Sequence, residues 1–454
     1  MRAVLVWSVI PLGLMAPASH GQSVFDEVSF RTMSVGGIHL NSVSVYSGYS
    51  TSAYPGGYGQ LPSIGSGGLL GGDVSYGASA SVGGQYHRGR TNFSILYFAG
   101  YGGLARYSGA NGFSQSLSFS VSHPLSAKWT LSVSGAGSDM TTAQYLFQPS
   151  SVSVVSQTPA SFDDLAAAFS VGQFSSSQAA SMLSGAPALE SPVRSLLLGD
   201  RVLSYSAQAS LNYAYSSRLT FHLSSFTAAG QNRIGGTTGV PAQNYVMPRS
   251  IGFTAGMGFS YSLSPRTQVG FDVEGSRIGN HYQSGYYTAA MASVSRKMGM
   301  HWFLGVHGGG SHNQVINQPY GVPSTVQIGA GGSIGFQTYQ HTLVGSYDRN
   351  GADPYGFALG SNTTVSAAWN FHRPGSRWGV FTGFGQQQIR NTGYATFSGW
   401  EASAGISSSL NTQMSLSAQY VYMNSSGTYL GNMENFAVQS VRVALNWAPR
   451  SVTR

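Results

Sequence analysis

The sequence predicts an all-β fold, a transmembrane antiparallel β-barrel of about 18 strands, with 16 as the alternative count. Three observations lead to this prediction. Apolar and polar residues alternate with a period of two through most of the chain after residue 70. Charged residues make up only 8% of the chain, against about 25% in ordinary globular domains. Short and long connections alternate between the segments, as they do between the two ends of such a barrel.

The first residues have the features of a secretory signal peptide. Arg2 precedes an apolar stretch that is short for a membrane span, and small residues follow it. A buried hydrophobic N-terminus is the alternative. We therefore expect residues 1–21 to be a cleaved signal peptide and residues 22–36 to be a periplasmic N-terminal segment.

Alternation defines the strands that should form the barrel, residues 37–447. In one segment Leu203, Tyr205 and Leu211 share one face, and serine, glutamine and asparagine share the other. The first segment is irregular because its apolar face slips between Leu40 and Val43, which requires a bulge or a break. The predicted strands lie at 37–49, 73–86, 90–101, 113–122, 127–138, 202–214, 217–228, 249–262, 265–277, 284–295, 299–310, 325–337, 340–349, 359–371, 376–388, 396–408, 411–423 and 436–447.

The parity of the connections supports an even number of strands. The strand at 73–86 precedes a short turn and the last strand follows a long loop, so both descend and the C-terminal tail, 448–454, is periplasmic. One rising strand must then precede residue 73, which supports the segment at 37–49. Soluble β solenoids and propellers also contain many short strands, but no fixed-period repeat is visible.

The third long connection, residues 139–201, is much longer than the others and is predicted to be extracellular. Residues 159–169 have a helical pattern, with Ser161 as the cap and Asp163 and Asp164 in the first turn. An apolar face on that helix has no use at an exposed loop tip. We expect a constriction or plug inside the barrel that includes Asp163 and Asp164; an external cap or mobile loop is the alternative.

The terminal strand Val441-Arg442-Val443-Ala444-Leu445-Asn446-Trp447 alternates and ends in an aromatic residue. In this and in its overall architecture the chain resembles Gram-negative outer-membrane porin-type β-barrels, although seven residues follow the aromatic one. The resemblance implies export to the cell outer membrane, membrane lipid as surroundings and insertion by the barrel-assembly machinery. Five tryptophans near turn ends are expected to form an interfacial girdle: Trp129, Trp302, Trp369, Trp378 and Trp447.

Several function classes find no support in the residues. The chain has no cysteine, and no histidines or carboxylates show metal-ligand spacing, so we expect no disulfide, metal or cofactor. The net charge of +8 is spread without a basic helix or compact basic run, which argues against nucleic acid. No nucleophile motif accompanies the histidines, so a non-enzyme is favoured and no catalytic residue is assigned.

The lumen should be lined by small polar residues, which leave an interior of about 18 strands open. Asp272 and Glu274, two residues apart, should share a face there, either to select solutes or to pair with a neighbouring strand. The residues predicted to line the pore are Gln208, Asn212, His222, Asp272, Glu274, His307, Glu401 and Arg442.

The sparse charge of the predicted lumen favours passive passage of small hydrophilic, largely uncharged solutes. An exopolysaccharide export pore is one alternative, and a structural or surface-recognition barrel is another. An acidic polymer would require more lumen arginine or lysine than the single Arg442. An occluded lumen without conductance would favour the recognition barrel.

Overall fold

The computed structural model describes ten stretches of the chain: residues 37–51, 72–105, 112–141, 201–232, 250–280, 284–316, 324–350, 360–391, 395–429 and 432–449. The expected leader and N-terminal segment, and Asp163 and Asp164 with their helix, lie outside these stretches. No helix long and apolar enough to span a membrane is present in the described part.

The described residues form 18 strands. Their bounds are β1 His39–Ser50, β2 Asp73–Arg88, β3 Thr91–Leu104, β4 Gly112–Pro124, β5 Trp129–Thr141, β6 Arg201–Ala214, β7 Leu219–Asn232, β8 Ser250–Ser264, β9 Thr267–Asn280, β10 Ser284–Met298, β11 Trp302–Val315, β12 Thr325–Gln337, β13 His341–Asn350, β14 Gly360–His372, β15 Trp378–Asn391, β16 Ala395–Ser409, β17 Met414–Tyr429 and β18 Asn432–Trp447.

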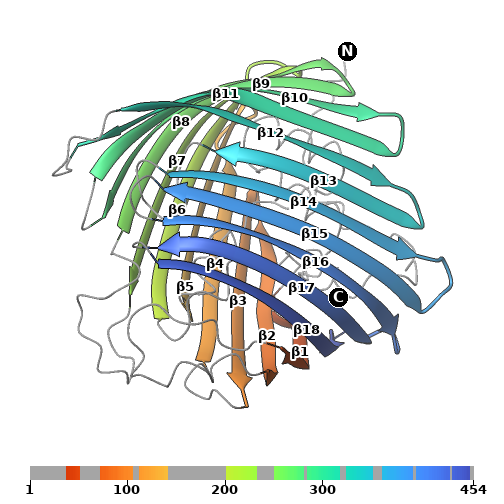
Figure 1. Cartoon of the computed structure of the whole chain (residues 1–454). Helices are drawn as coiled ribbons and strands as arrows, with labels where there is room; N and C mark the ends of the chain where they lie inside the picture. The colour runs from red at the N-terminus through yellow and green to blue at the C-terminus, as the bar shows by residue number, and fades with distance from the viewer. Residues whose placement is uncertain are drawn as a thin grey trace, which may run out of the picture.

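Each strand pairs with its neighbours in sequence, and β1 also pairs antiparallel with β18. This last pairing closes the sheet, so no free edge remains among the described strands. In Figure 1 strands β12 to β18 form the wall nearer the viewer, and β2 to β8 form the wall behind it. The predicted all-β, 18-strand antiparallel barrel is confirmed.

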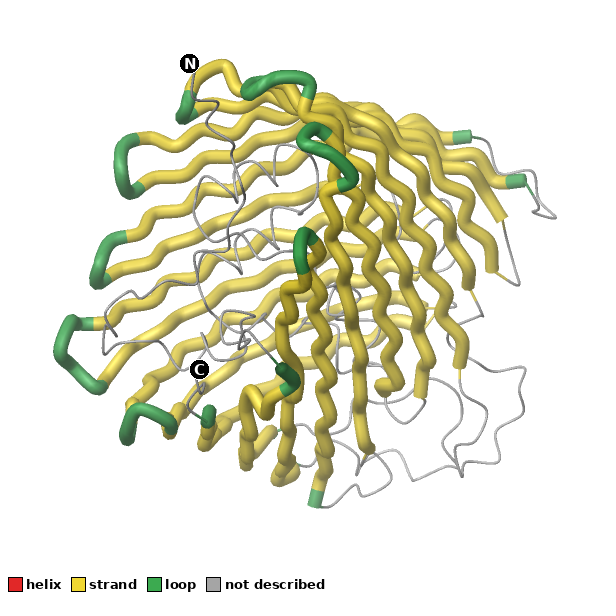
Figure 2. The backbone as a smooth tube through the Cα atoms, turned by 180° about the vertical axis from the view of Figure 1, so that it is seen from behind, coloured by secondary structure: helices red, strands yellow, loops and turns green. Residues whose placement is uncertain are grey.

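The described connections are tight turns at one end of the barrel, drawn green in Figure 2. Three of them contain a glycine with positive φ: Gly89 (61°), Gly299 (67°) and Gly375 (77°). Only a residue without a Cβ adopts that conformation cheaply, so these glycines allow the chain to reverse within a few residues. The long connections join the strands at the other end, called here the long-connection end.

Two details of the strands bear on the sequence predictions. The register of β1 against β2 shifts between Leu40 and Ser42, where the slip in the apolar face predicted a bulge. Strand β5 continues to Thr141 and β6 begins at Arg201, so Asp139 belongs to a strand. The third long connection is therefore 142–200 and not 139–201, because backbone pairing continues after the alternation has faded.

Residues along each strand face alternately into and out of the barrel. Large apolar side chains dominate the outer face, and Leu223, Met257 and Ile328 are 53%, 64% and 73% exposed. The outer face packs its aromatic rings side by side, as in Phe221–Phe259 and Phe259–Phe271 with centroids 6.4 and 6.3 Å apart. The inner face is the opposite set of positions and is mostly serine, glycine, threonine and charged or amide side chains.

Candidate functional site: the inner face of the barrel

The eight residues predicted to line the interior all occupy inner-face positions, as the strand registers show. Asn212 lies directly opposite His222, and Gln208 lies four residues earlier on β6. Glu401 on β16 is only 1% exposed. The structure brings together some of these residues, His222 with Asp272 and Glu274, and places Arg442 on a distant strand.

His222 and Asp272 meet across an intervening strand. The register aligns His222 on β7 with Gly258 on β8, and Gly258 with Asp272 on β9. His222 Nε2 and Asp272 Oδ1 are 2.5 Å apart, above the backbone of Gly258. A Cβ at Gly258 would approach His222 Cε1 to 2.6 Å and overlap Asp272 and a backbone carbonyl. Glycine at this position therefore makes room for the pair.

The same arrangement recurs four strands further round the barrel. His307 on β11, Gly331 on β12 and Asp348 on β13 are aligned in register. His307 Nε2 and Asp348 Oδ2 are 3.6 Å apart, with side chains 15% and 5% exposed. A Cβ at Gly331 would lie 2.7 Å from His307 Nε2. Each of the two histidine–aspartate pairs therefore spans an intervening strand at a glycine.

Glu274, Tyr287 and Ser311 lie on β9, β10 and β11, nearer the long-connection end than the two pairs. Tyr287 forms side-chain hydrogen bonds with both Glu274 and Ser311. Ala289 stands between Glu274 and Ser311 in the ladder, and its small side chain is 4% exposed. Met291 on β10, aligned with Asp272, also faces inward among them. The polar side chains of this part of the inner face are called here the β7–β13 wall: His222, Asp272, Glu274, Tyr287, His307, Ser311 and Asp348.

Arg442 lies far from this wall. Strand β18 is nine positions round the barrel from β9. The guanidinium carbon of Arg442 lies 3.8 Å from the centroid of the Tyr46 ring, a cation–π geometry. Gly48 faces Arg442 and Gly77 faces Tyr46 in the register, so small residues again make room for long side chains. The interior therefore has a group of carboxylates on β9 to β13 and the guanidinium of Arg442 across from it, while Glu401 on β16 and Asp73 on β2 face inward nearer to Arg442.

Hydroxyl pairs line much of the remaining inner face. Serines on adjacent strands hydrogen bond across the ladder at 2.6 to 2.7 Å, in the pairs Ser42–Ser81, Ser94–Ser120, Ser138–Ser204 and Ser346–Ser366. Hydroxyls can exchange these bonds for bonds to water or solute, because each is both donor and acceptor. Within the described residues, no three His, Cys, Asp or Glu side chains are placed to bind a metal ion.

Sequence reasoning missed two features of the inner face. Tyr46 and Tyr287 were not predicted there, because aromatic residues in these strands mostly point outward. Phe303, Val344 and Phe381 also point inward near the turns and are 0%, 2% and 4% exposed. Glycines opposite Phe303 and Phe381 were the available signal: Gly335 faces Phe303, and a Cβ at Gly405 would overlap Phe381.

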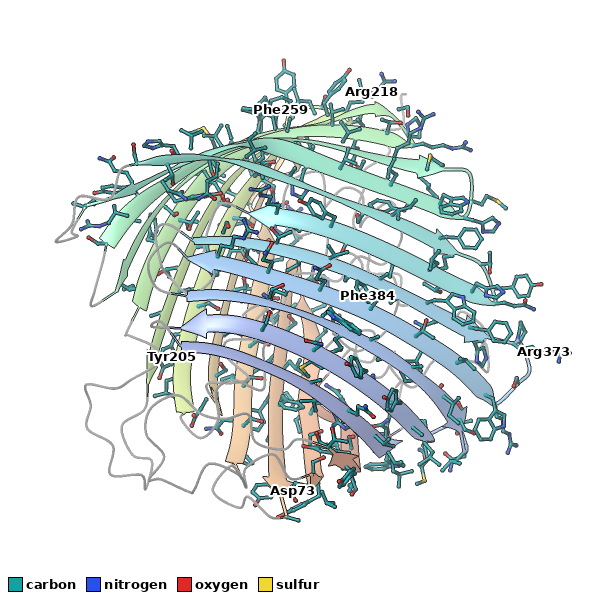
Figure 3. All side chains as sticks on the ribbon, viewed as in Figure 1. Asp73, Tyr205, Arg218, Phe259, Arg373 and Phe384 are labelled. Atoms are coloured by element: carbon teal, nitrogen blue, oxygen red, sulfur yellow. The ribbon has the colours of Figure 1, made fainter. Side chains whose placement is uncertain are left out.

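The ends of the barrel differ in the side chains that they present. The five tryptophans of the predicted girdle all face outward near the short turns. Trp129 packs against Tyr213 and Trp302 against Phe336 in tilted geometry, with ring centroids 4.5 and 4.6 Å apart. Figure 3 shows Arg218 and Arg373 near this end and Phe259 on the outside of the barrel. An even-stranded closed sheet with an apolar exterior and an aromatic girdle is the architecture of outer-membrane porin-type barrels.

No protein-family model matches the chain, and no curated protein matches it. Among solved structures it is similar to Pseudomonas aeruginosa OccK2 (OpdF) in complex with glucuronate, at 11% identity and TM-score 0.43, covering 92% of this chain and 100% of that one. It is also similar to P. aeruginosa OpdL, at 12% identity and TM-score 0.41, covering 91% of this chain and 98% of that one. The FrpB iron transporter of Neisseria meningitidis is similar at 10% identity and TM-score 0.40, covering 89% of this chain and 81% of that one.

Proposed function

We propose that the chain is an outer-membrane channel for the passive passage of small hydrophilic, largely uncharged solutes. The observation that carries the proposal is the contrast between the two faces of one closed sheet. The exterior is apolar and suits lipid, whereas the interior is lined by hydroxyls, amides and paired charges that suit water. A barrel of 18 strands is wide enough to hold an aqueous path.

The charges of the β7–β13 wall supply a finer part of this proposal. Asp272, Glu274 and Asp348 face the interior there, and Glu401 faces it from β16. Among the arginines of the described strands, Arg442 is the one that faces inward away from the turns, and it opposes these four carboxylates. Carboxylates along a confined path raise the local concentration of cations. We therefore propose that cations and amine-bearing solutes pass more readily than anions.

Single-channel recording of the refolded full chain in planar bilayers tests the proposal. Ohmic current steps and a reversal potential of cation-selective sign under a salt gradient are expected. Replacing Glu274 with Gln should move the reversal potential toward zero, and Arg442→Gln should move it further from zero. A folded barrel in the bilayer that carries no current would contradict the channel.

A surface-recognition barrel with a filled interior is the second candidate, and a specific observation favours it. Phe303, Asn313 and Glu401 face inward and are 0%, 0% and 1% exposed, less than residues beside a wide water column would be. Absence of conductance in a correctly folded protein would select this candidate. The many inward serines and the small interior side chains favour the channel.

Two further proposals concern residues outside the described stretches. We propose that residues 1–21 are removed on export, which N-terminal sequencing of protein from outer membranes tests; an intact Met1 would refute it. We also propose that the 142–200 connection, with Asp163 and Asp164, narrows the barrel. Deleting residues 160–185 should then raise the conductance, and an unchanged conductance would place the segment outside. Lipid surroundings and the barrel-assembly machinery remain the proposed partners, and we assign no catalytic role.

A further inference from the structure

The outer face changes character at the long-connection end of β13, β14 and β15. Tyr347 and Arg349 are alternate residues of β13 and both point outward. The register aligns Arg349 with Thr363 on β14, and Thr363 with Gln388 on β15. Arg390 follows Gln388 on the same face. These four residues, Arg349, Thr363, Gln388 and Arg390, form the outer basic patch.

The two arginines of the patch are exposed and one is held in place. With its amide oxygen turned toward the guanidinium, Gln388 accepts hydrogen bonds from Arg390 Nη2 at 3.0 Å and from Arg390 Nε at 3.2 Å. The backbone of Arg349 lies two strands from that of Gln388, which is about 10 Å in a sheet whose strands are about 4.8 Å apart. A group placed over Thr363 lies between the strands of the two arginines, where the long side chain of Arg349 can approach it from one side and Arg390, held by Gln388, faces it from the other.

Among the described residues, the outer face around the patch carries no carboxylate. Every outer-face position described on β12 to β16 is apolar, aromatic, hydroxyl, amide or arginine, and none is a carboxylate. The inward carboxylates Asp348 and Glu401 are 4% and 1% exposed on the other face. The patch thus presents two cations, a hydroxyl and an amide in a row, which is donor chemistry suited to a phosphate.

The height of the patch places it at a membrane boundary. Trp400 faces Gln386 across the β15–β16 ladder, and Tyr347 lies two residues from Arg349 on the side of the barrel's middle. Aromatic rings therefore lie next to the charges, on the side toward the membrane core. At the same end of β2, β3 and β4 the outer face carries Tyr76, Tyr101 and Phe113, all exposed. Arg277 on β9 also faces outward near this end, with its guanidinium carbon 5.8 Å from the centroid of the Tyr286 ring. The two arginines of the outer basic patch are therefore a local concentration of charge and not a property of the whole rim.

We propose that the outer basic patch binds the phosphate of a lipid headgroup in the leaflet at the long-connection end. The inference rests on the membrane placement in the proposed function and not on conduction. Arg–phosphate pairing is bidentate and strong in this partly dehydrated layer. Each basic residue near an anionic membrane surface strengthens binding by about fivefold.

Native mass spectrometry of the refolded full chain with diphosphorylated lipid A tests the proposal. The double variant Arg349→Gln/Arg390→Gln should lower lipid affinity by about 25-fold and either single variant by about fivefold. The matched control is Arg373→Gln/Arg377→Gln, which removes two arginines at the other end and should leave affinity unchanged. Dephosphorylated lipid A should bind as weakly to the wild type as lipid A does to the double variant, and inorganic phosphate alone should give no adduct.

Equal lipid A binding by the double variant and the wild type would overturn the proposal, as would undiminished binding of the dephosphorylated lipid. A phosphate adduct without lipid would show a free-anion site instead. If the wild type formed dimers in lipid-free detergent and the double variant did not, the patch would instead be an interface between copies of this chain. Heat-modifiable gel mobility verifies that each variant is folded. A barrel that binds lipid A as expected but conducts no current would leave this inference standing and remove the channel.

Discussion

Strands β7, β8 and β9 carry two adjacent cross-strand rows that face opposite ways. The outer row, Phe221–Phe259–Phe271, packs three aromatic rings side by side. The inner row, His222–Gly258–Asp272, is one residue away on each strand and has an imidazole and a carboxylate bridging a glycine. The outer row fills space with apolar surface, whereas the inner row leaves space so that two polar groups can meet.

This difference shows that the two faces tolerate different changes. The outer face depends on burial in an apolar surrounding, so a charge there lacks any compensating partner. The inner face depends on the exact size of the middle residue, so a single methyl group can disturb it. The two faces can therefore be separated by substitutions on the same strand.

The largest expected effect comes from a charge on the outer face. Met257 is 64% exposed near the middle of β8, beside the inner row. Met257→Arg should destabilise the folded barrel in lipid by about 2–4 kcal/mol, because the guanidinium would sit in hydrocarbon. Urea unfolding in vesicles, followed by tryptophan fluorescence, measures this. Thr254→Arg on the inner face of the same strand is the control, and equal losses would mean that the faces are assigned wrongly.

The next effect tests the inner row. Gly258→Ala should cost about 1–3 kcal/mol, since the added methyl overlaps Asp272 and a backbone carbonyl and so forces the backbone to shift. Gly275→Ala on β9 is the matched control, because a Cβ there meets nothing within 4 Å. The control should stay within about 0.5 kcal/mol of the wild type. If both glycines tolerate alanine equally in the same unfolding assay, the space above Gly258 is not needed.

The smallest effect concerns ring packing in the outer row. Phe221→Leu keeps an apolar side chain in contact with lipid but removes the edge of the ring pair with Phe259, which should cost about 0.5–1.5 kcal/mol. Phe384→Leu on β15 is a comparison variant on the outer face, with its ring 6.4 Å from Trp400. A double-mutant cycle of Phe221 and Phe259 isolates the pair energy, and a coupling of zero would show that the rings only fill space.

The strands could be predicted from the sequence because a one-sided apolar surface leaves a period of two. All 18 predicted segments coincide with strands. The errors are mostly at the long-connection end, as in β17, predicted over 411–423 and observed as Met414–Tyr429. There Asn424, Ser425 and Ser426 continue the backbone ladder without apolar contrast, so alternation cannot reveal them.

The inner face could be predicted position by position, but not its pairings. Parity along one strand is enough to place His222 or Asp272 inside. Their contact depends on the register of three strands and on Gly258 in the middle one, and a single sequence does not give register. Phe303 and Phe381 broke the rule that apolar residues face outward, since glycines on the next strand accommodate them.

The ion selectivity of the β7–β13 wall tests the central claim most directly. Reversal potentials should be recorded across a tenfold salt gradient for the refolded wild type and for Asp272→Asn/Glu274→Gln, with Gln208→Asn as an inner-face control. We predict current through single molecules, a cation-selective wild type, a double variant shifted toward zero and a control equal to the wild type. A wild type that selects anions, or a double variant with unchanged reversal potential, would contradict the account.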